Sequence, residues 1–306
     1  MRHAVFSVVF STLLAALLCG AADVTAQTLV RDTVSGDYIL RFPWADSVVE
    51  VPIEAGDQVE PTLEAIVESN GRAWVYRYVL RNAPGAKRAI QYLQFPCPPQ
   101  DSLRRFEAPR HRVARSQTSG PRVMCEFMIA LSEEHRLWPG DTLAGLTVFS
   151  AYLPGIVEAR VNAATRSFEL DGEIYEVLPS EIRELIERAH GEDYVTGGGK
   201  RVAVVAPLRS GPALKEPGAV ALIEADRAVS CGHLQWIRDQ AVCSALATQL
   251  AVASRAVQNG NRTAAISALD RFIAVLNAYR GKAVNHNAYS VLATNARLVR
   301  SHMAPR

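Results

Sequence analysis

The sequence carries no marked excess of charge of either sign. Its 306 residues include 33 Lys and Arg and 31 Asp and Glu, so the formal net charge is +2 with neutral histidines. So small a net charge gives the molecule no overall field that would select nucleic acid or a membrane surface. We therefore expect no nucleic-acid partner. A charged fraction of 21% beside an apolar fraction of 49% indicates a globular chain without long disordered stretches.

Short signatures of catalysis and metal binding are also missing. The chain contains no G-x-S-x-G, C-x-x-C or H-E-x-x-H motif. The stretch T-G-G-G-K-R at 196–201 departs from a phosphate-binding loop, because Arg201 stands where that loop needs Ser or Thr. We expect no metal, no cofactor and no enzymatic activity. A hydrolase with dispersed carboxylates needs no local motif, so that alternative stays open.

Long apolar runs are absent except at the start of the chain. Arg2 and His3 precede the mostly apolar residues 4–18, and small residues ending in V-T-A at 24–26 follow. This is the plan of a secretory signal peptide (1–26), with cleavage after Ala26. Cys19 leaves a lipoprotein alternative open. The sequence thus predicts an exported protein, periplasmic, extracellular or associated with the cell surface, with no transmembrane segment in the mature chain.

Cysteine is scarce in the mature chain, which keeps four: Cys97, Cys125, Cys231 and Cys243. An even number in an exported chain indicates disulfides, and four cysteines allow three pairings. Proximity in the sequence favours Cys97–Cys125 and Cys231–Cys243.

Alternation of apolar and polar residues dominates the chain from residue 46 to residue 170. It predicts strands at 62–69, 72–81, 87–95, 123–130, 142–150, 156–161 and 166–170. Turn signals separate them, among them Asn70-Gly71, a dipeptide typical of a type I′ hairpin. Short strands with frequent turns and no helix between them predict an antiparallel β-sandwich, assigned to residues 27–178. Residues 137–161 resemble an edge motif of small secreted bacterial β-sandwich proteins, which implies a fold and no activity.

The one long interruption of this pattern, between Pro98 and Arg122, is rich in arginine. Only Asp101 and Glu107 oppose its six arginines, Arg104, Arg105, Arg110, Arg112, Arg115 and Arg122. One interpretation is a solvated loop that its charges keep soluble. The other is an anion-binding loop for a glycan or another polyanion, since guanidinium pairs with sulfate, phosphate and carboxylate groups in a bidentate manner.

The C-terminal part of the chain changes to helical periodicity. Residues 179–218 are interpreted as a connector with a short helix at 180–190, a strand at 202–206 and a proline-rich linker. A small α-helical bundle is expected over 219–303, with helices at 240–258, 262–280 and 285–303 after a first one near 219–229. The predicted fold is a multi-domain chain of α and β structure, with the sandwich first and the bundle last.

One helical stretch carries a family resemblance. Residues 261–284, N-R-T-A-A-I-S-A-L-D-R-F-I-A-V-L-N-A-Y-R-G-K-A-V, resemble the FIMAH module, with Phe272-Ile273 and Gly281-Lys282 among the matching features. The resemblance covers about residues 240–300. It implies an accessory helical domain of bacterial secreted and surface proteins, and it implies no catalytic residue.

Three functions of different classes remain open. The first is a non-catalytic structural or interaction protein of the cell envelope, with an envelope protein as partner. The second is a glycan- or polyanion-binding module that uses the arginine-rich segment. The third is the hydrolase with dispersed carboxylates.

Overall fold

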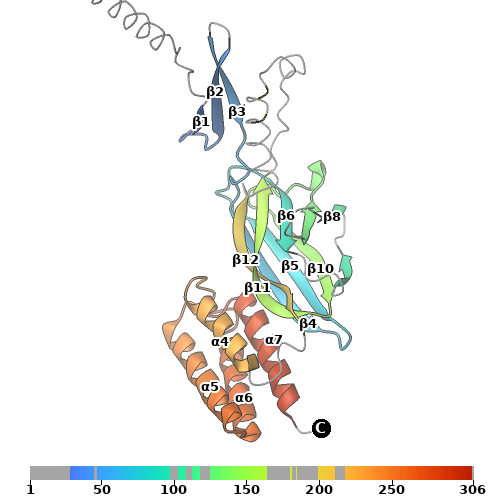
Figure 1. The fold of residues 1–306 in the computed structure, drawn as a ribbon, viewed down its shortest axis with the longest axis vertical. Helices are drawn as coiled ribbons and strands as arrows, with labels where there is room; N and C mark the ends of the chain where they lie inside the picture. The colour runs from blue at the N-terminus through green and yellow to red at the C-terminus, as the bar shows by residue number, and fades with distance from the viewer. Residues whose placement is uncertain are drawn as a thin grey trace, which may run out of the picture. The chain divides into compact units, whose positions relative to one another are not determined.

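The structure, a computed structural model, describes residues 28–44, 47–96, 103–107, 112–117, 125–163, 199–210 and 218–304, together with residues 180 and 184. The chain divides into two compact units, one from residues 1–55 and 165–196 and the other from residues 56–164 and 197–306. Figure 1 shows the ribbon. The predicted signal peptide, the predicted strand at 166–170 and nearly all of the helix at 180–190 lie outside the described residues. The signal peptide and the domain boundaries stay predictions.

A three-stranded antiparallel sheet forms most of the described part of the first unit. Its order is β1 (Thr28–Arg31), β2 (Tyr38–Trp44) and β3 (Ser47–Ile53). The Asp32 carboxylate accepts hydrogen bonds from the second and third amides after it, which builds the β1–β2 turn. Gly36 has a φ of 80° in that turn, a value that glycine adopts without strain. Leu40, Phe42 and Val51 bury one face. The sequence prediction of strands began at residue 62 and missed this sheet.

The second unit contains two antiparallel sheets, which confirms the predicted sandwich class. One has the order β4–β5–β10–β7 and the other the order β12–β11–β6–β9–β8. The rings of Tyr78 in β5 and Phe95 in β6 lie 4.9 Å apart between the two sheets. The strands are β4 (Pro61–Ser69), β5 (Trp74–Asn82), β6 (Ile90–Pro96), β7 (Leu103–Glu107), β8 (Arg112–Gln117), β9 (Cys125–Ala130), β10 (Thr142–Ser150), β11 (Leu153–Ala163) and β12 (Lys200–Arg209).

The predicted type I′ turn at Asn70-Gly71 is wrong. Gly71 has a φ of 82°, but Asn70 is not among the described residues with positive φ, and a type I′ turn needs both. The hairpin closes through a wider loop between Ser69 and Trp74 instead. The side chain of Asn70 holds this loop, because its oxygen accepts hydrogen bonds from two following amides at 3.0 and 2.8 Å.

In the described residues 218–304, four helices follow the sandwich at positions close to those expected from the sequence. They are α4 (Gly218–Cys231), α5 (Gln240–Gln258), α6 (Arg262–Tyr279) and α7 (His286–Met303). Asp239, Asn261 and Asn285 precede three of them, and each side chain accepts a hydrogen bond from an amide of the first turn. Such caps satisfy amides that have no partner within the helix, so they define where the helices begin.

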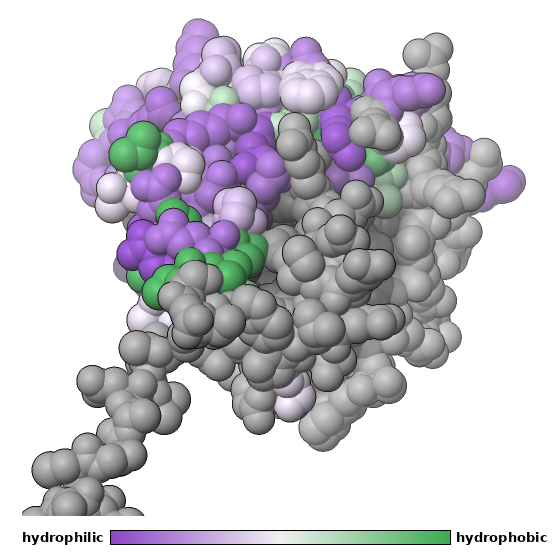
Figure 2. Space-filling view, turned by 90° about the horizontal axis from the view of Figure 1, so that it is seen from above, coloured by the Kyte–Doolittle hydropathy of each residue, from purple (hydrophilic) through white to green (hydrophobic). Residues whose placement is uncertain are grey.

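One apolar core runs through both sheets and the helices of the second unit. It includes Tyr78 and Leu93 of the strands, Phe272 of α6 and Leu292 of α7, all nearly inaccessible to solvent. Figure 2 shows mostly hydrophilic described surface on the face seen from above, with small separate apolar patches. Because the core is continuous, the position of the helices against the sandwich is set by packing as well as by the chain connection.

Candidate functional site

Helix α7 lies along one edge of the sandwich. It contacts β4, β11 and β12, and β4 and β12 are the terminal strands of their sheets. The buried side chains of Asn287 and Ser290 form hydrogen bonds with the backbone of β4. Asn295, also buried, donates a hydrogen bond to the Pro154 carbonyl of β11 at 3.0 Å. Specific polar contacts therefore join the bundle to both sheets.

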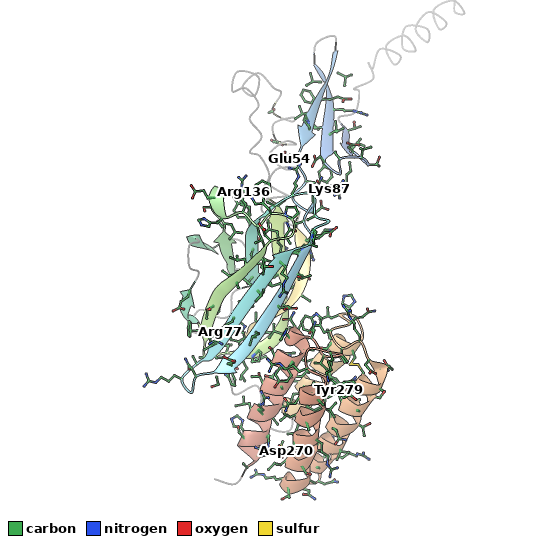
Figure 3. The ribbon with its side chains drawn as sticks, turned by 180° about the vertical axis from the view of Figure 1, so that it is seen from behind. Glu54, Arg77, Lys87, Arg136, Asp270 and Tyr279 are labelled. Carbon is green, nitrogen blue, oxygen red and sulfur yellow. A yellow bond between two sulfur atoms is a disulfide. The ribbon has the colours of Figure 1, made fainter. Side chains whose placement is uncertain are left out.

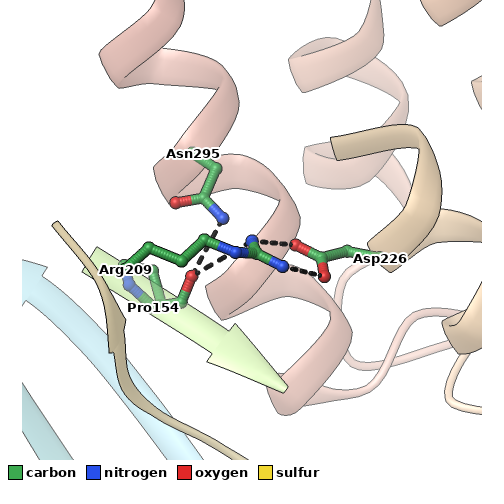
Figure 4. A network of polar contacts seen from close by, with 4 residues as sticks. All are labelled: Pro154, Arg209, Asp226 and Asn295. Carbon is green, nitrogen blue, oxygen red and sulfur yellow. Dashed lines mark hydrogen bonds and ion pairs between the residues drawn. The ribbon is translucent and has the colours of Figure 1, made fainter. Parts of the chain in front are cut away.

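A buried ion pair holds α4 at the same edge (Figure 4). The Arg209 guanidinium at the end of β12 contacts the two carboxylate oxygens of Asp226 at 2.5 and 2.7 Å. These side chains are 15% and 5% exposed. The guanidinium also donates to the Pro154 carbonyl at 3.5 Å, the group that accepts from Asn295. The bidentate geometry is a strong form of charge-assisted hydrogen bonding.

A groove of about 400 Å³ lies between α7 and the end of the β4–β5 hairpin. Its lining residues are Val67, Glu68, Ser69 and Trp74 on the strands and Thr294, Arg297, Leu298 and Ser301 on the helix. Successive strand side chains point to opposite faces, so three consecutive lining residues indicate that the groove follows the backbone edge of β4. The helix residues recur at the spacing of one helix face. The groove is therefore bounded by a strand edge on one side and a helix face on the other.

The helix side of the groove carries one cation, Arg297. Arg297 donates a hydrogen bond to the Tyr289 hydroxyl at 2.6 Å, and its guanidinium carbon lies 5.5 Å from that ring centroid. The guanidinium carbon of Arg280 lies 4.3 Å from the same centroid, within the range of a cation–π contact. On the strand side, Glu68 forms an ion pair with Arg77, which is labelled in Figure 3. This pairing balances the one carboxylate of the groove.

Two tyrosines of β5 lie in the core of the sandwich. Burial raises the pKa of Tyr78 well above its ordinary value, and burial followed by the charge of Tyr78 raises the pKa of Tyr76. The Tyr76 hydroxyl donates to the Tyr152 carbonyl at 2.7 Å. Both phenols therefore stay neutral, and they pack in the core.

The predicted arginine site is only partly described, and its segment is not one loop. Arg104 and Arg105 belong to strand β7, and Arg112 and Arg115 belong to strand β8. Arg110 and Arg122 lie outside the described residues, as do the side chains of all six arginines. The two strands are the last members of different sheets. The backbone thus carries the arginine-rich segment from the edge of one sheet to the edge of the other, and anion binding stays a hypothesis.

The predicted disulfides differ in how far the structure describes them. Cys231 and Cys243 form a disulfide between the end of α4 and the first turn of α5, which is the predicted pairing. Cys97 and the side chain of Cys125 lie outside the described residues, so their pairing stays a prediction. Within the described ranges, no group of three or more His, Cys, Asp or Glu side chains is arranged to hold a metal ion. No helix in the described part of the chain is long and apolar enough to cross a membrane.

These features define a β-sandwich with a helical bundle fixed along one edge and a groove at their junction. Residues 235–301 match the FIMAH domain, which confirms the family resemblance found over 240–300. The match spans α5, α6 and nearly all of α7, so it includes the helix side of the groove. No curated protein matches the chain.

The residues of this junction were not predicted from the sequence. Glu68 and Trp74 were assigned to ordinary strand positions, and Thr294, Arg297 and Ser301 lie in a helix that was analysed only for its apolar residues. No local motif marks them. The one usable signal was the polar character of α7 at Asn287, Ser290 and Asn295, which are buried among apolar residues.

Proposed function

We propose that the protein is an exported, non-catalytic interaction protein whose sandwich and FIMAH bundle together present a binding groove. The observation that carries the proposal is the groove itself, which neither part forms alone. Its volume of about 400 Å³ is within the range of binding sites for small molecules or short segments, and Trp74 and Leu298 supply apolar surface. Arg297 adds a cation at its helix wall.

The polar groups of the groove are engaged in structural contacts, which favours binding over catalysis. Glu68 pairs with Arg77, the Ser69 hydroxyl accepts a hydrogen bond from the Gly71 amide, and the Ser301 hydroxyl donates to the Leu298 carbonyl. A nucleophilic hydroxyl would need a base within hydrogen-bonding reach instead. The disulfide of Cys231 and Cys243 supports export, because such bonds persist in oxidising compartments.

Site-specific photo-crosslinking in the native envelope tests this proposal. A photoreactive amino acid at position 301 lies in the groove, and one at Thr248, on the exposed surface of α5, is the matched control. We expect a discrete crosslinked partner from position 301, absent from position 248 and lost with Leu298→Asp. Equal capture from both positions would contradict an interaction groove. Turnover of glycan, ester or peptide substrates that Leu298→Asp abolishes would favour the hydrolase.

A second candidate function is polyanion binding at the opposite edge of the sandwich. The backbone topology favours it, since four of the six predicted arginines belong to the edge strands β7 and β8. Arginine-bearing edge strands have another explanation, because charge on an edge prevents unwanted strand pairing. The two explanations differ in whether a polyanion is bound.

Retention on heparin distinguishes these explanations. We expect the wild type to be retained at low salt and to elute as salt screens the charges over about 10 Å at 0.1 M. Replacing Arg104, Arg105, Arg112 and Arg115 with Gln should abolish retention. The control replaces four exposed arginines of the bundle, Arg238, Arg255, Arg262 and Arg271. Early elution of the wild type at about 50 mM salt, where screening is weak, would refute polyanion binding.

A further inference from the structure

The face of α7 that meets β4 is polar where a core helix is ordinarily apolar. Asn287 and Ser290 are 3% and 4% exposed, and they lie three residues apart, hence on one face of the helix. Buried polar side chains of this kind persist when they are hydrogen-bonded. Here every bond that they make with the sandwich goes to the backbone of a single strand.

The Asn287 carboxamide bonds to β4 as the backbone of a neighbouring strand would. Its nitrogen donates to the Leu63 carbonyl at 2.9 Å, and its oxygen accepts from the Ala65 amide at 2.8 Å. Both halves of the carboxamide thus bond to successive edge groups of β4. A backbone peptide group offers the same donor and acceptor to a strand beside it.

Ser290 repeats this pattern one step further along the strand. Its hydroxyl donates to the Ala65 carbonyl at 2.8 Å and accepts from the Val67 amide at 3.3 Å. Two side chains therefore satisfy four consecutive outward groups of β4: the Leu63 carbonyl, both groups of Ala65 and the Val67 amide. The strand is bonded on both sides over this stretch, although it is the terminal strand of its sheet.

Without α7, the edge of β4 would suit addition of another strand. Its sequence, P-T-L-E-A-I-V-E-S, is nine residues of regular alternation, and it contains no glycine or internal proline to interrupt pairing. Two such edges from separate molecules can pair antiparallel about a two-fold axis, because that arrangement is self-complementary. The natural competitor of α7 for this edge is therefore β4 of a second copy.

We propose that α7 is a surrogate edge strand, and that the FIMAH bundle thereby blocks β4-to-β4 association of two copies of this protein. The bundle then has a second role beside forming the groove. It covers the outer edge of β4, which the sandwich would otherwise expose. That edge can pair with a second copy only where α7 detaches from β4.

Residue-resolved hydrogen exchange of the full chain tests the first half of the proposal. In an unprotected edge strand only alternate amides are slow, here Glu64 and Ile66, which face β5. Capping by α7 predicts that Ala65 and Val67 are slow as well. In Asn287→Ala/Ser290→Ala their exchange should accelerate at least tenfold, while that of Glu64 and Ile66 stays slow. Fast exchange of Ala65 and Val67 in the wild type, or no change in the variant, would overturn the proposal.

Light scattering after size-exclusion chromatography tests the second half. The mass of the double variant should rise with concentration under conditions where the wild type and Thr248→Ala have equal mass. Thr248 is a suitable control because it is exposed and its hydroxyl donates within α5, to the Ser244 carbonyl. If the double variant does not fold, Ser290→Ala alone should accelerate Val67 and leave Glu64 unchanged. A folded double variant whose mass equals that of the wild type at every concentration refutes the blocking role.

Discussion

Removing the charge of Asp226 should destabilise the second unit strongly, because it leaves the Arg209 guanidinium buried without its carboxylate. Both side chains are largely buried, at 5% and 15% exposure, and both carboxylate oxygens are engaged. Breaking a buried pair by removing one partner costs about 3–5 kcal/mol. Partial exposure of Arg209 places the expected loss for Asp226→Asn near the lower end, about 3 kcal/mol.

The loss of unfolding free energy should come from the unpaired Arg209 charge and not from the loss of the ion pair itself. Replacing both partners with apolar groups of similar size is often neutral or stabilising, so Arg209→Met/Asp226→Leu should cost less than about 1 kcal/mol. Glu224→Gln is the matched control on the same helix. It breaks an ion pair with Arg227 in which Glu224 is 43% exposed, and we expect at most about 1 kcal/mol.

Urea unfolding followed by circular dichroism measures these differences. The single variant should also melt about 6–12 °C below the wild type, if 1 kcal/mol corresponds to about 2–4 °C in a unit of this size. A loss below about 1 kcal/mol for Asp226→Asn would refute the account of a buried, coupled pair. So would a double variant as unstable as the sum of the two single variants, because coupled partners are not additive.

Three further predictions concern the core and the disulfide. Phe272→Ala should lower stability by about 3–5 kcal/mol, and strand and helix signals should be lost in one transition because the core is continuous; two separate transitions would contradict this. Burial raises the pKa of Tyr76 and Tyr78, so stability should hold up to the ordinary tyrosine pKa of about 10 and fall as pH rises further. Urea titrations at pH 8 and pH 11 check this, and equal stabilities would refute it. Removing Cys231 and Cys243 together should cost about 3 kcal/mol, and an unchanged melting temperature would contradict that.

Local patterns were enough to predict most strands and helices of the second unit. The strand Thr142–Ser150 and the helix Gln240–Gln258 have the predicted bounds, because alternation and helical spacing reflect which side chains the element buries. Side-chain caps also follow from the residue itself, as Asn261 shows. In these cases the residues that determine a strand, helix or cap lie within a few positions of it.

Features that depend on distant parts of the chain were missed. A strand was expected at 202–206, but it was placed in a connector and not in the sandwich, because nothing in residues 200–209 indicates that β11 will pair with them. The arginine-rich segment was interpreted as a loop, since strands β7 and β8 are short and bond to different sheets. Edge strands carry charged residues that weaken the alternation on which strand prediction depends. The prediction failed there for a physical reason.

The apolar residues of α7 explain why a bundle forms. They do not explain how that bundle is positioned on the sandwich. Leu292, Ala296 and Val299 recur at helical spacing, and all three are fully buried. Asn287 and Asn295 lie outside that apolar stripe and are polar, yet they are buried too, because α7 is covered nearly all round. Apolar contacts tolerate a range of helix positions, whereas a carboxamide that must meet one carbonyl and one amide tolerates few. The match of residues 235–301 to FIMAH therefore accounts for the bundle, while its polar residues determine the position of the bundle on the sandwich.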